Sequence, residues 1–548
     1  TVAHAESTLT MMKKIRDFDY NARRMELHLG NAQHKTFYRD NDRQTEVDLH
    51  KPYVDNYRFI KDGHTYKRIP EVMDCWFESG SMPFGQAHYL GVESPSSLKS
   101  VKSPTGGLED LKTLQTKFVY PADFIIEGLD QTRGRFRTLH VCGNAVMKGN
   151  SFNNVVINGL ILAEDGRKMS KSLKNYPDPA YLFAKYGTDA YRLYMLSSPA
   201  VRAEPMRFSE KGVDQVYKDF TAATINSYKF FETYAKIDNF AYDDPTIYFL
   251  RHGKAEGQQA DAKLLPETIE AMKDPKYIEM VLRTNPDVIY ASPFVRTKKT
   301  AEIIQQIFRT HRQKDIPIVL EDGLGSDSGK EIDSYMQLVK KEAGKNVLIV
   351  SHGPTFQILR SHVYTTKTAP ALGKMQCVEM PTQVITNELD KWILAAIHEV
   401  GLELEKQMDS YSLDGGAKIV LSFVDKLNNR FIRRSRRRFR ASGMDSDKAS
   451  AYTTLFTVLE RYMKICAPFA PFLAEHVYLE LQGFRTTKSE GDISVHLEHL
   501  PLSSEQYVNR ELLNEIAQVR RIISLGLFIR SKNKIAVKQP LSKMEIKM

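Results

Sequence analysis

Two lysines and two serines near residue 170 have the side chains and the spacing for phosphate chemistry. Lys168, Ser170, Lys171 and Ser172 follow a turn at Asp165–Gly166. Ammonium groups on flexible stems stabilise the negative charge that grows in a transition state. The spacing therefore fits a loop that closes over a polyphosphate. Taken alone, these residues fit a solvated basic turn equally well, so the rest of the sequence must decide.

A second set of candidate residues follows three apolar runs in the middle of the chain. Arg251 and His252 follow the first run, Arg296 follows the second and His352 follows the third. Amphipathic helical patterns separate the runs, which predicts an open parallel sheet with its site at the strand ends. Guanidinium groups match phosphate oxygens in pairs, and a neutral imidazole is a competent nucleophile. Arg-His-Gly by itself is more often a surface turn, but the three strand ends together favour a phosphate site.

Two further apolar runs must position the remaining candidates. Residues 124–126 and 155–162 predict short buried strands. Glu127 and Asp130 lie at the carboxyl end of the first, and a helix is expected to begin near Gln131. Carboxylates at that edge of a parallel sheet lie where ligands bind. The alternative for Glu127 is a helix-cap or surface carboxylate.

Several blocks of sequence occur in an order typical of one enzyme family. The blocks are DLHKPYVD from residue 48, RIPEVMDCWFESGSMPFGQAHY at 68–89, YPADFIIEGLDQTRG at 120–134, KMSKS at 168–172 and YGTDAYRLYMLSSPAVRAEPMRFSEKGVDQV from residue 186. In order and spacing they resemble isoleucyl-tRNA synthetases, which are class I aminoacyl-tRNA synthetases, downstream of the editing insertion. The resemblance covers nearly everything outside residues 245–383.

This resemblance implies a ligase that uses ATP, with Mg²⁺, to activate isoleucine and transfer it to tRNA. Lys168, Ser170 and Lys171 would stabilise the triphosphate while the amino-acid carboxylate attacks the α-phosphate. The residues that would line the aminoacyl-adenylate site are Trp76, Glu127, Gly128, Asp130 and Gln131. Trp76 could instead be a core residue.

Three arginines depart from the family pattern, which usually has tryptophan at these positions. They are Arg135, Arg430 and Arg440. A guanidinium group at 135 would lie beside the isoleucine side chain, where burial without a partner is expensive. Either three unrelated substitutions occurred, or the source reads some arginine-type codons as tryptophan, which peptide mass spectrometry of the native protein would decide.

The family's other phosphate-binding signature, His-x-Gly-His, has only a partial echo at residues 28–31, and the editing domain is absent. The chain therefore resembles the second half of a synthetase. We expect a separate chain to carry the N-terminal half, and no adenylate formation without it.

Residues 245–383 resemble the histidine phosphatase family, which has a phosphoglycerate-mutase-like fold. The resemblance implies that His252 takes a phosphoryl group and that Arg251, Arg296 and His352 hold the phosphate. The family's proton-donating acid would fall near Glu321 or Asp322, where the surrounding sequence fits poorly. An alternative function is therefore a phosphomonoesterase, with the synthetase parts as RNA binders or relics. A third possibility is a chain without activity.

From residue 386 the synthetase resemblance resumes with the start of a helical anticodon-binding domain. A helix at 416–440 is apolar on one side and ends in a cluster of arginines, and 465–481 is expected to be another packed helix. The cluster comprises Arg433, Arg434, Arg436, Arg437 and Arg438. Such a cluster is usually a solvated face, but the family favours contact with the tRNA backbone, and we name the first four as tRNA-binding.

The totals exclude other classes of protein. Four cysteines lie far apart among 548 residues, which argues against a disulfide framework or a metal site and for a reducing, cytoplasmic location. No apolar run is long enough to cross a membrane. The net charge of +10 suits an anionic partner, with nucleic acid as the leading candidate.

These observations predict an α/β plus all-α chain with six parts. They are an unassigned segment at 1–47, the second half of a Rossmann-like synthetase catalytic domain at 48–211, a connecting helix at 212–244, the inserted α/β phosphatase-like domain at 245–383, the anticodon-binding domain at 384–485 and a tail at 486–548.

Overall fold

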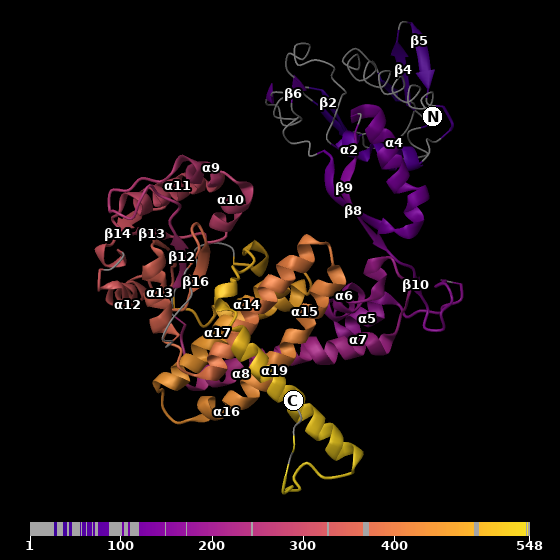
Figure 1. The fold of residues 1–548 in the computed structure, drawn as a ribbon. Helices are drawn as coiled ribbons and strands as arrows, with labels where there is room; N and C mark the ends of the chain where they lie inside the picture. The colour runs from indigo at the N-terminus through magenta and orange to yellow at the C-terminus, as the bar shows by residue number, and fades with distance from the viewer. Residues whose placement is uncertain are drawn as a thin grey trace. The chain divides into compact units, whose positions relative to one another are not determined.

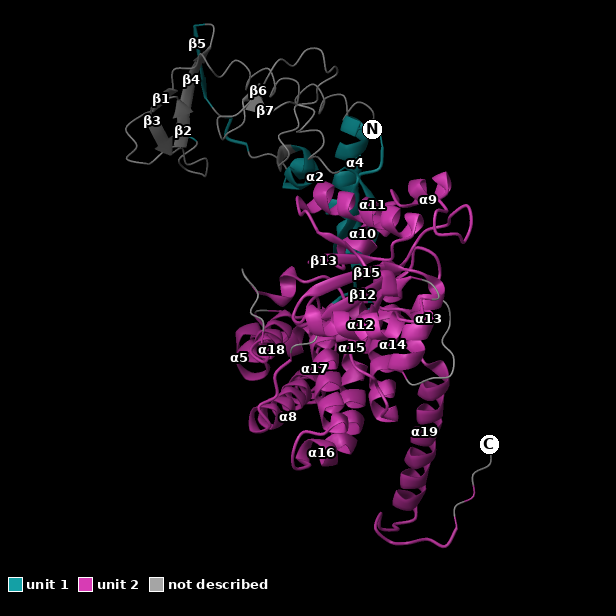
Figure 2. Cartoon of the chain, turned by 90° about the vertical axis from the view of Figure 1, so that its left-hand side faces the viewer, with its two compact units in different colours: residues 1–160, 202–204 teal, residues 161–201, 205–548 magenta. Residues whose placement is uncertain are grey.

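The computed structural model describes most of the chain after residue 119 and short pieces before it. The described residues are 27–29, 37–40, 43–46, 55, 57–61, 63–67, 69–71, 75–86, 101–102, 108–109, 120–147, 149–170, 172–242, 245–325, 328–364, 372–486, 493–543 and 545. The chain forms two compact units, residues 1–160 with 202–204, and residues 161–201 with 205–548 (Figure 2). None of the described helices is long and apolar enough to cross a bilayer.

In the first unit, two parallel strands and the helix between them form a βαβ element. Strand β8 (Ala122–Gly128) pairs with β9 (Phe152–Asn158), and α4 (Arg135–Met147) connects them and packs on α2 (Cys75–Gln86). Shorter strands precede α4: β1 (Leu27–Leu29), β2 (Phe37–Asp40), β3 (Arg43–Glu46), β4 (Tyr57–Lys61), β5 (His64–Lys67), β6 (Val101–Lys102) and β7 (Leu108–Glu109). A parallel pair with a crossover helix brings the carboxyl ends of both strands to one edge.

Two details of this unit differ from the sequence prediction. The chain after β8 first forms a 3₁₀ turn, η3 (Leu129–Arg133), and the α-helix begins only at Arg135, because the backbone of Gly134 leaves the helical region. The two predicted strands are also less buried than expected. Phe124 and Ile126 of β8 are exposed, and the run 155–162 is not one strand, because β9 ends at Asn158. Val156 is buried but Val155 is exposed, because successive residues of a strand face opposite sides.

The second unit begins with the strand pair and helices that hold the KMSKS stretch. Strand β10 (Ile161–Leu162) pairs in parallel with β11 (Met206–Arg207), and α5 (Pro179–Tyr186), α6 (Thr188–Leu196), η4 (Pro199–Arg202) and α7 (Glu210–Val216) follow. Asp178 begins α5 by accepting the backbone N–H of Ala180 at 2.8 Å, and a proline occupies the first helical position. Leu182, Ala190 and Phe208 form the small core of this part.

The inserted domain is a five-stranded sheet with helices on both faces. Its strand order is β14 (Ile318–Leu320), β13 (Val288–Ala291), β15 (Asn346–Ser351), β12 (Thr246–Arg251), β16 (Cys377–Met380), with β16 antiparallel and the rest parallel. Its helices are α9 (Pro266–Ala271), α10 (Pro275–Leu282), α11 (Val295–Arg312), η6 (Asp322–Leu324), α12 (Glu331–Lys341) and α13 (Gly353–Val363). Figure 1 shows α10 and α11 on one side of the sheet and α12 and α13 on the other.

The strands of this sheet are mostly apolar because helices cover both faces. Along β12, Ile247 and Phe249 enter one core, while Leu250 enters the other. Leu502 and Tyr507, which the sequence analysis placed in the tail, each add a side chain to one of these two cores. Residues near 500 therefore pack with the inserted domain.

The remaining helices pack around one large core. They are η5 (Tyr217–Ala222), α8 (Ala223–Ile237), α14 (Glu388–Asp409), α15 (Leu413–Asp425), η7 (Lys426–Ile432), α16 (Arg433–Arg440), α17 (Ser446–Cys466), α18 (Pro471–Gln482), η8 (Val495–Leu497), η9 (Glu505–Tyr507) and α19 (Arg510–Lys532). The single helix predicted at 465–481 is wrong. The chain leaves α17 after Cys466 and starts α18 at Pro471, because Pro468 and Pro471 cannot donate the backbone hydrogen bonds that a continuous helix needs.

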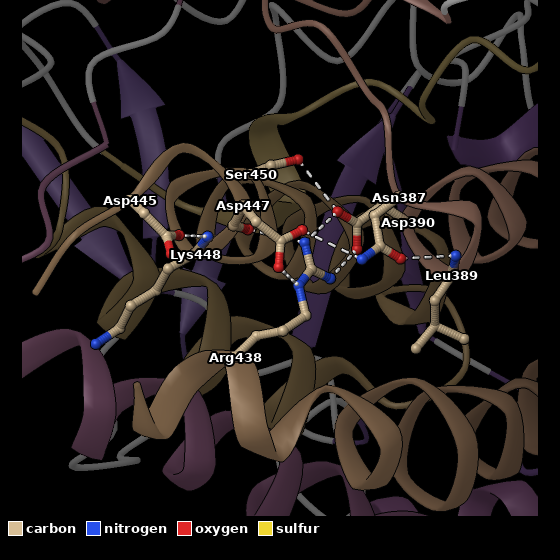
Figure 3. A network of polar contacts seen from close by, with 8 residues as sticks. All are labelled: Asn387, Leu389, Asp390, Arg438, Asp445, Asp447, Lys448 and Ser450. Carbon is tan, nitrogen blue, oxygen red and sulfur yellow. Dashed lines mark hydrogen bonds and ion pairs between the residues drawn. The ribbon is translucent and has the colours of Figure 1, made fainter. Parts of the chain in front are cut away.

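A buried ion-pair network fixes three helices of this core to one another (Figure 3). The guanidinium group of Arg438 on α16 donates to both carboxylate oxygens of Asp390 on α14, at 2.6 and 2.8 Å, and to Asp447 on α17 at 2.8 Å. Ser450 donates a further bond to Asp390 at 3.1 Å. The Asp390 side chain is fully buried, so Arg438 is a structural residue, unlike its neighbours in the arginine cluster.

Replacing Asp390 by alanine should destabilise the helical core by about 3–5 kcal/mol, because it leaves the Arg438 charge buried with half its partners. Urea denaturation followed by the fluorescence of Trp392, which is buried in the same core, measures the loss. Asp425→Ala is the matched control. Its side chain is 48% exposed and its arginine partners lie at 3.4 and 3.5 Å, so its removal should change stability by less than about 1 kcal/mol. Equal losses in the two variants would contradict the assignment.

Candidate functional site

The KMSKS stretch begins on a tight hairpin. Lys168 forms an antiparallel bridge with Leu162, and the N–H of Ala163 donates to the carbonyl of Arg167 at 2.9 Å. Gly166 turns the chain with a φ of +84°, a value that glycine adopts without strain. Ser170 and Ser172 share a hydrogen bond between their hydroxyl groups at 2.7 Å. Lys171 lies outside the described residues.

In the first unit, the residues predicted to line the adenylate site come together at the carboxyl end of β8. Gln131 donates to the carboxylate of Asp130 at 2.9 Å. Gly134 has room only for a hydrogen atom, because a Cβ would lie 2.6 Å from the Trp76 ring and 2.7 Å from the Gln131 amide oxygen. Gly128 is confined in the same way by Asp130, at 2.7 Å. Trp76 thus packs at this site rather than in the core, with 39% of its surface exposed.

Arg135 also enters this site and pairs with Glu127. Its guanidinium Nη1 lies 2.7 Å from the Glu127 carboxylate, and both side chains are about one-third exposed. Burial of a guanidinium group without a partner would be expensive at this position, and the structure avoids that cost because Arg135 is paired and partly exposed. The two residues are eight positions apart, but the 3₁₀ turn between them folds α4 back toward the end of β8.

In the inserted domain, the four residues predicted to bind phosphate meet at the carboxyl ends of β12, β13 and β15. The rings of His252 and His352 lie 5.1 Å apart. Arg296 lies between them, with Nε donating to His252 Nε2 at 3.1 Å and Nη2 lying 3.3 Å from His352 Nδ1. Arg251 donates from Nη1 to the carbonyl of Leu372 at 2.6 Å, and its buried Nε has no hydrogen-bond partner.

The hydrogen bonds determine which nitrogen of His252 is free to react. Its Nδ1 lies 2.5 Å from the carbonyl of Gly253, which can only accept, so Nδ1 carries the proton. Nε2 therefore holds a lone pair, which Arg296 orients. This is the arrangement that a nucleophilic imidazole requires.

Burial and positive neighbours keep both histidines neutral. Burial, with Arg296, Arg251 and Lys374 acting in the same direction, lowers the pKa of His252 to about 4, against the opposing effect of the hydrogen bond that its Nδ1–H donates to the Gly253 carbonyl. Burial also lowers the pKa of His352 to about 3, with His252, Arg296 and Arg251 acting in the same direction. Within the described part of the domain, no carboxylate bonds to Arg251, His252, Arg296 or His352. The pocket is thus positively charged and can take up an anion.

The predicted proton donor stays a prediction. Glu321 caps η6 by accepting the N–H of Gly323 at 3.3 Å and also accepts a bond from Ser334 at 3.3 Å. Neither Glu321 nor Asp322 is recorded in contact with the histidines in the described structure, and residues 326–327 lie outside it.

Sequence reasoning missed two residues of this pocket. Ser292 lies 2.8 Å from His352 Nε2 and so fixes the orientation of that ring. Gln259 accepts a bond from Arg296 Nη1 through its carbonyl at 2.6 Å. Ser292 directly follows β13, so the strand-end rule that found the other residues could also have found it. The loop carbonyl of Gln259 carries no sequence signal.

Four of the five clustered arginines on α16 are exposed. They are Arg433, Arg434, Arg436 and Arg437. Arg430 is partly buried, with its Nε 3.5 Å from Asp425, and Arg440 donates to the hydroxyl of Tyr234 at 2.9 Å. The exposed four can contact an anionic partner.

Replacing Arg251 by methionine should stabilise the protein in phosphate-free buffer by about 1 kcal/mol, because it removes a desolvated charge for which the described structure shows no carboxylate partner. Thermal denaturation with and without inorganic phosphate measures this. Phosphate should raise the melting temperature of the wild type and have little effect on the variant. Arg309→Met is the control, because Arg309 is 47% exposed and paired with Asp315. Destabilisation by Arg251→Met with the phosphate response retained would contradict the assignment.

Comparisons with known proteins support the predictions for the regions before and after the inserted domain. Residues 19–207 match the family described as tRNA synthetases class I (I, L, M and V), and residues 390–545 match the anticodon-binding domain of tRNA ligase. The isoleucine–tRNA ligase of Protochlamydia amoebophila is 31% identical over 500 residues, which cover 91% of this chain and 33% of the relative. The chain thus spans about a third of the length of the curated relatives it matches.

Two solved structures are also similar to the chain. A leucyl-tRNA synthetase of Agrobacterium radiobacter, in a ternary complex with tRNA, is 13% identical with a TM-score of 0.39, covering 87% of this chain and 38% of that one. Phosphoserine phosphatase from Entamoeba histolytica is 17% identical with a TM-score of 0.20, covering 26% and 98%. The two family models thus match residues on either side of the inserted domain, in the order synthetase then anticodon-binding domain.

Proposed function

We propose that this chain supplies the second half of the active site of an isoleucine–tRNA ligase. The observation that carries the proposal is a relative of that activity, aligned over 91% of the chain, together with a synthetase match and an anticodon-domain match in the same order. The reaction belongs in the cytoplasm, where isoleucine and tRNA meet.

The proposed reaction has two steps. The carboxylate of isoleucine attacks the α-phosphate of ATP, the bond to the β-phosphate oxygen breaks, and pyrophosphate leaves. A terminal hydroxyl group of tRNA then attacks the adenylate carbonyl and AMP leaves. Lys168, Ser170 and Lys171 would stabilise the negative charge on the phosphates in the first step. Mg²⁺ would travel with ATP, bound to its phosphate oxygens.

Glu127 and Arg135 set a condition on amino-acid binding. The α-ammonium group of isoleucine is the natural partner for the Glu127 carboxylate, which Arg135 holds at 2.7 Å. The substrate must displace this guanidinium group or share the carboxylate with it. Because both side chains are partly exposed, the pair is worth about 1 kcal/mol at most, so this competition is modest.

The exposed arginines of α16 are the proposed tRNA contact. Arg433, Arg434, Arg436 and Arg437 present four charges on one short helix. Contacts between arginine and phosphate position RNA without reading its sequence. Discrimination between tRNA molecules would then come from other residues.

We further propose that a complete ATP site also needs residues from the part of the relatives' length that this chain does not cover. Isoleucine-dependent exchange of pyrophosphate into ATP tests the whole assignment, with this chain mixed with N-terminal halves of isoleucine–tRNA ligases. We expect exchange in the mixture and none with either part alone. Lys168→Ala should lower kcat about 100-fold, the usual effect of removing one stabilising donor.

Lys229→Ala is the control for that assay, because Lys229 is 57% exposed, paired with Glu232 and distant in sequence from the KMSKS stretch. Its kcat should equal that of the wild type. Absence of isoleucine-dependent exchange in every pairing would contradict the proposed ligase.

A second activity is favoured by the pocket of the inserted domain. We propose a phosphomonoesterase in which His252 Nε2 attacks phosphorus, the bond to the ester oxygen breaks, and the alcohol leaves with a proton from an acid or water. Water then attacks the phosphohistidine, which releases phosphate and restores the imidazole. The support is the neutral, oriented His252 beside two arginines that have no carboxylate partner among the described residues.

Hydrolysis of an aryl phosphate tests this second activity. Because the pKa of His252 is about 4, the nucleophile is neutral above roughly pH 5, and the rate should fall as the pH drops toward 4. His252→Ala should lose the activity, whereas His311→Ala, at an exposed position on α11, should keep it. Hydrolysis that survives in the His252 variant would exclude this nucleophile.

A further inference from the structure

The side chain of Asn175 binds the main chain of the KMSKS stretch at two points. Its amide oxygen accepts the N–H of Ser170 at 3.0 Å, and its amide nitrogen donates to the carbonyl of Lys168 at 3.1 Å. These two groups flank Met169 and face the same side, as in a strand that pairs with a neighbour. The side-chain amide thus makes the two hydrogen bonds that the main chain of a neighbouring strand would make, using both its donor and its acceptor.

The chain reverses its direction just before Asn175, which returns this side chain to the KMSKS stretch. Lys174 adopts a left-handed conformation with a φ of +46°, which reverses the chain just before Asn175. Such a conformation is unfavourable for a residue with a side chain, so contacts around it must compensate. Beyond Asn175, Asp178 starts α5 and fixes the following chain.

Three contacts together fix the position of the Lys168 main chain. Its backbone bridges to Leu162 on one side, its carbonyl accepts the Asn175 amide, and Met169 packs against the small core around Leu182. The base of the lysine stem is therefore fixed, while its ammonium group is free to reach a phosphate. Without Asn175, the hairpin bridge and the Met169 contact would remain, and the chain after Lys168 would lose its only side-chain clamp in the described structure.

We propose that Asn175 is a positioning residue for Lys168 in the ligase reaction. The assignment rests on the proposed ligase function for its chemical consequence. A displaced ammonium group stabilises the developing charge less well, while the amino-acid site on the first unit is unchanged. Loss of Asn175 should therefore lower kcat and leave the KM for isoleucine as it is.

The first experiment uses the chain alone and does not depend on ligase activity. Limited trypsin digestion with mass spectrometry measures cleavage after Lys168 in the wild type, Asn175→Ala and Asn175→Asp. We expect about tenfold faster cleavage in the alanine variant, as suits the loss of roughly two hydrogen bonds. The aspartate variant should be intermediate, because it keeps the acceptor for Ser170 and loses the donor to Lys168. Asn533→Ala, which removes one amide–carbonyl bond at the far end of α19, is the matched control.

The second experiment measures isoleucine-dependent pyrophosphate exchange in the reconstituted enzyme. Asn175→Ala should lower kcat about tenfold at unchanged KM for isoleucine, with Asn175→Asp again intermediate. Unchanged cleavage after Lys168 would overturn the clamp, and faster cleavage with unchanged kcat would overturn the positioning role. If the wild type shows no exchange, the ligase function fails, and the positioning role falls with it while the cleavage rates still decide the clamp.

Discussion

A charge buried in protein must be offset by a partner, and this constraint separates the structural arginines of the chain from the functional ones. Arg438 is held by Asp390 and Asp447, Arg461 by Glu379 and Arg485 by Glu460. Each of these pairs joins different elements. Arg251 and Arg296 are also withdrawn from water, but their recorded partners are carbonyl groups and histidines.

The same constraint explains the state of the two histidines beside those arginines. Two imidazolium ions would add further positive charge to a site where the described residues supply no carboxylate partner, so both rings stay neutral. The sheet tolerates this arrangement because its two cores bury apolar side chains on both faces of the central strands β12, β13 and β15. Proteins accept such locally unfavourable groups where they serve function. An anion would supply the missing charge.

The sequence predicted the elements whose pattern is local. Apolar runs located β12, β13 and β15, and the strand-end rule placed Arg251, His252, Arg296 and His352 at one edge, where the structure has them. Ordered blocks pointed to the synthetase and anticodon-binding domains, which the family matches support. These successes share one cause, because strand order and motif order both follow the chain.

What the sequence could not predict depends on contacts between distant residues. Arg438 was indistinguishable from its four neighbours until the positions of Asp390 and Asp447 were known. The partner of Arg135 depended on a 3₁₀ turn in place of the expected helix start, and Leu502 and Tyr507 joined the inserted domain across more than a hundred residues. Asn175 gave no signal either, because its role comes from a left-handed residue before it.

The most direct test of whether Arg251 and Arg296 bind an anion is a crystal structure of the chain, grown or soaked with phosphate or tungstate. We expect a tetrahedral anion bound by Arg251, Arg296 and His352, with its central atom facing Nε2 of His252, and no anion at Arg438. A pocket that remains empty at millimolar anion, or one in which Arg251 turns to a carboxylate of the chain, would contradict this expectation.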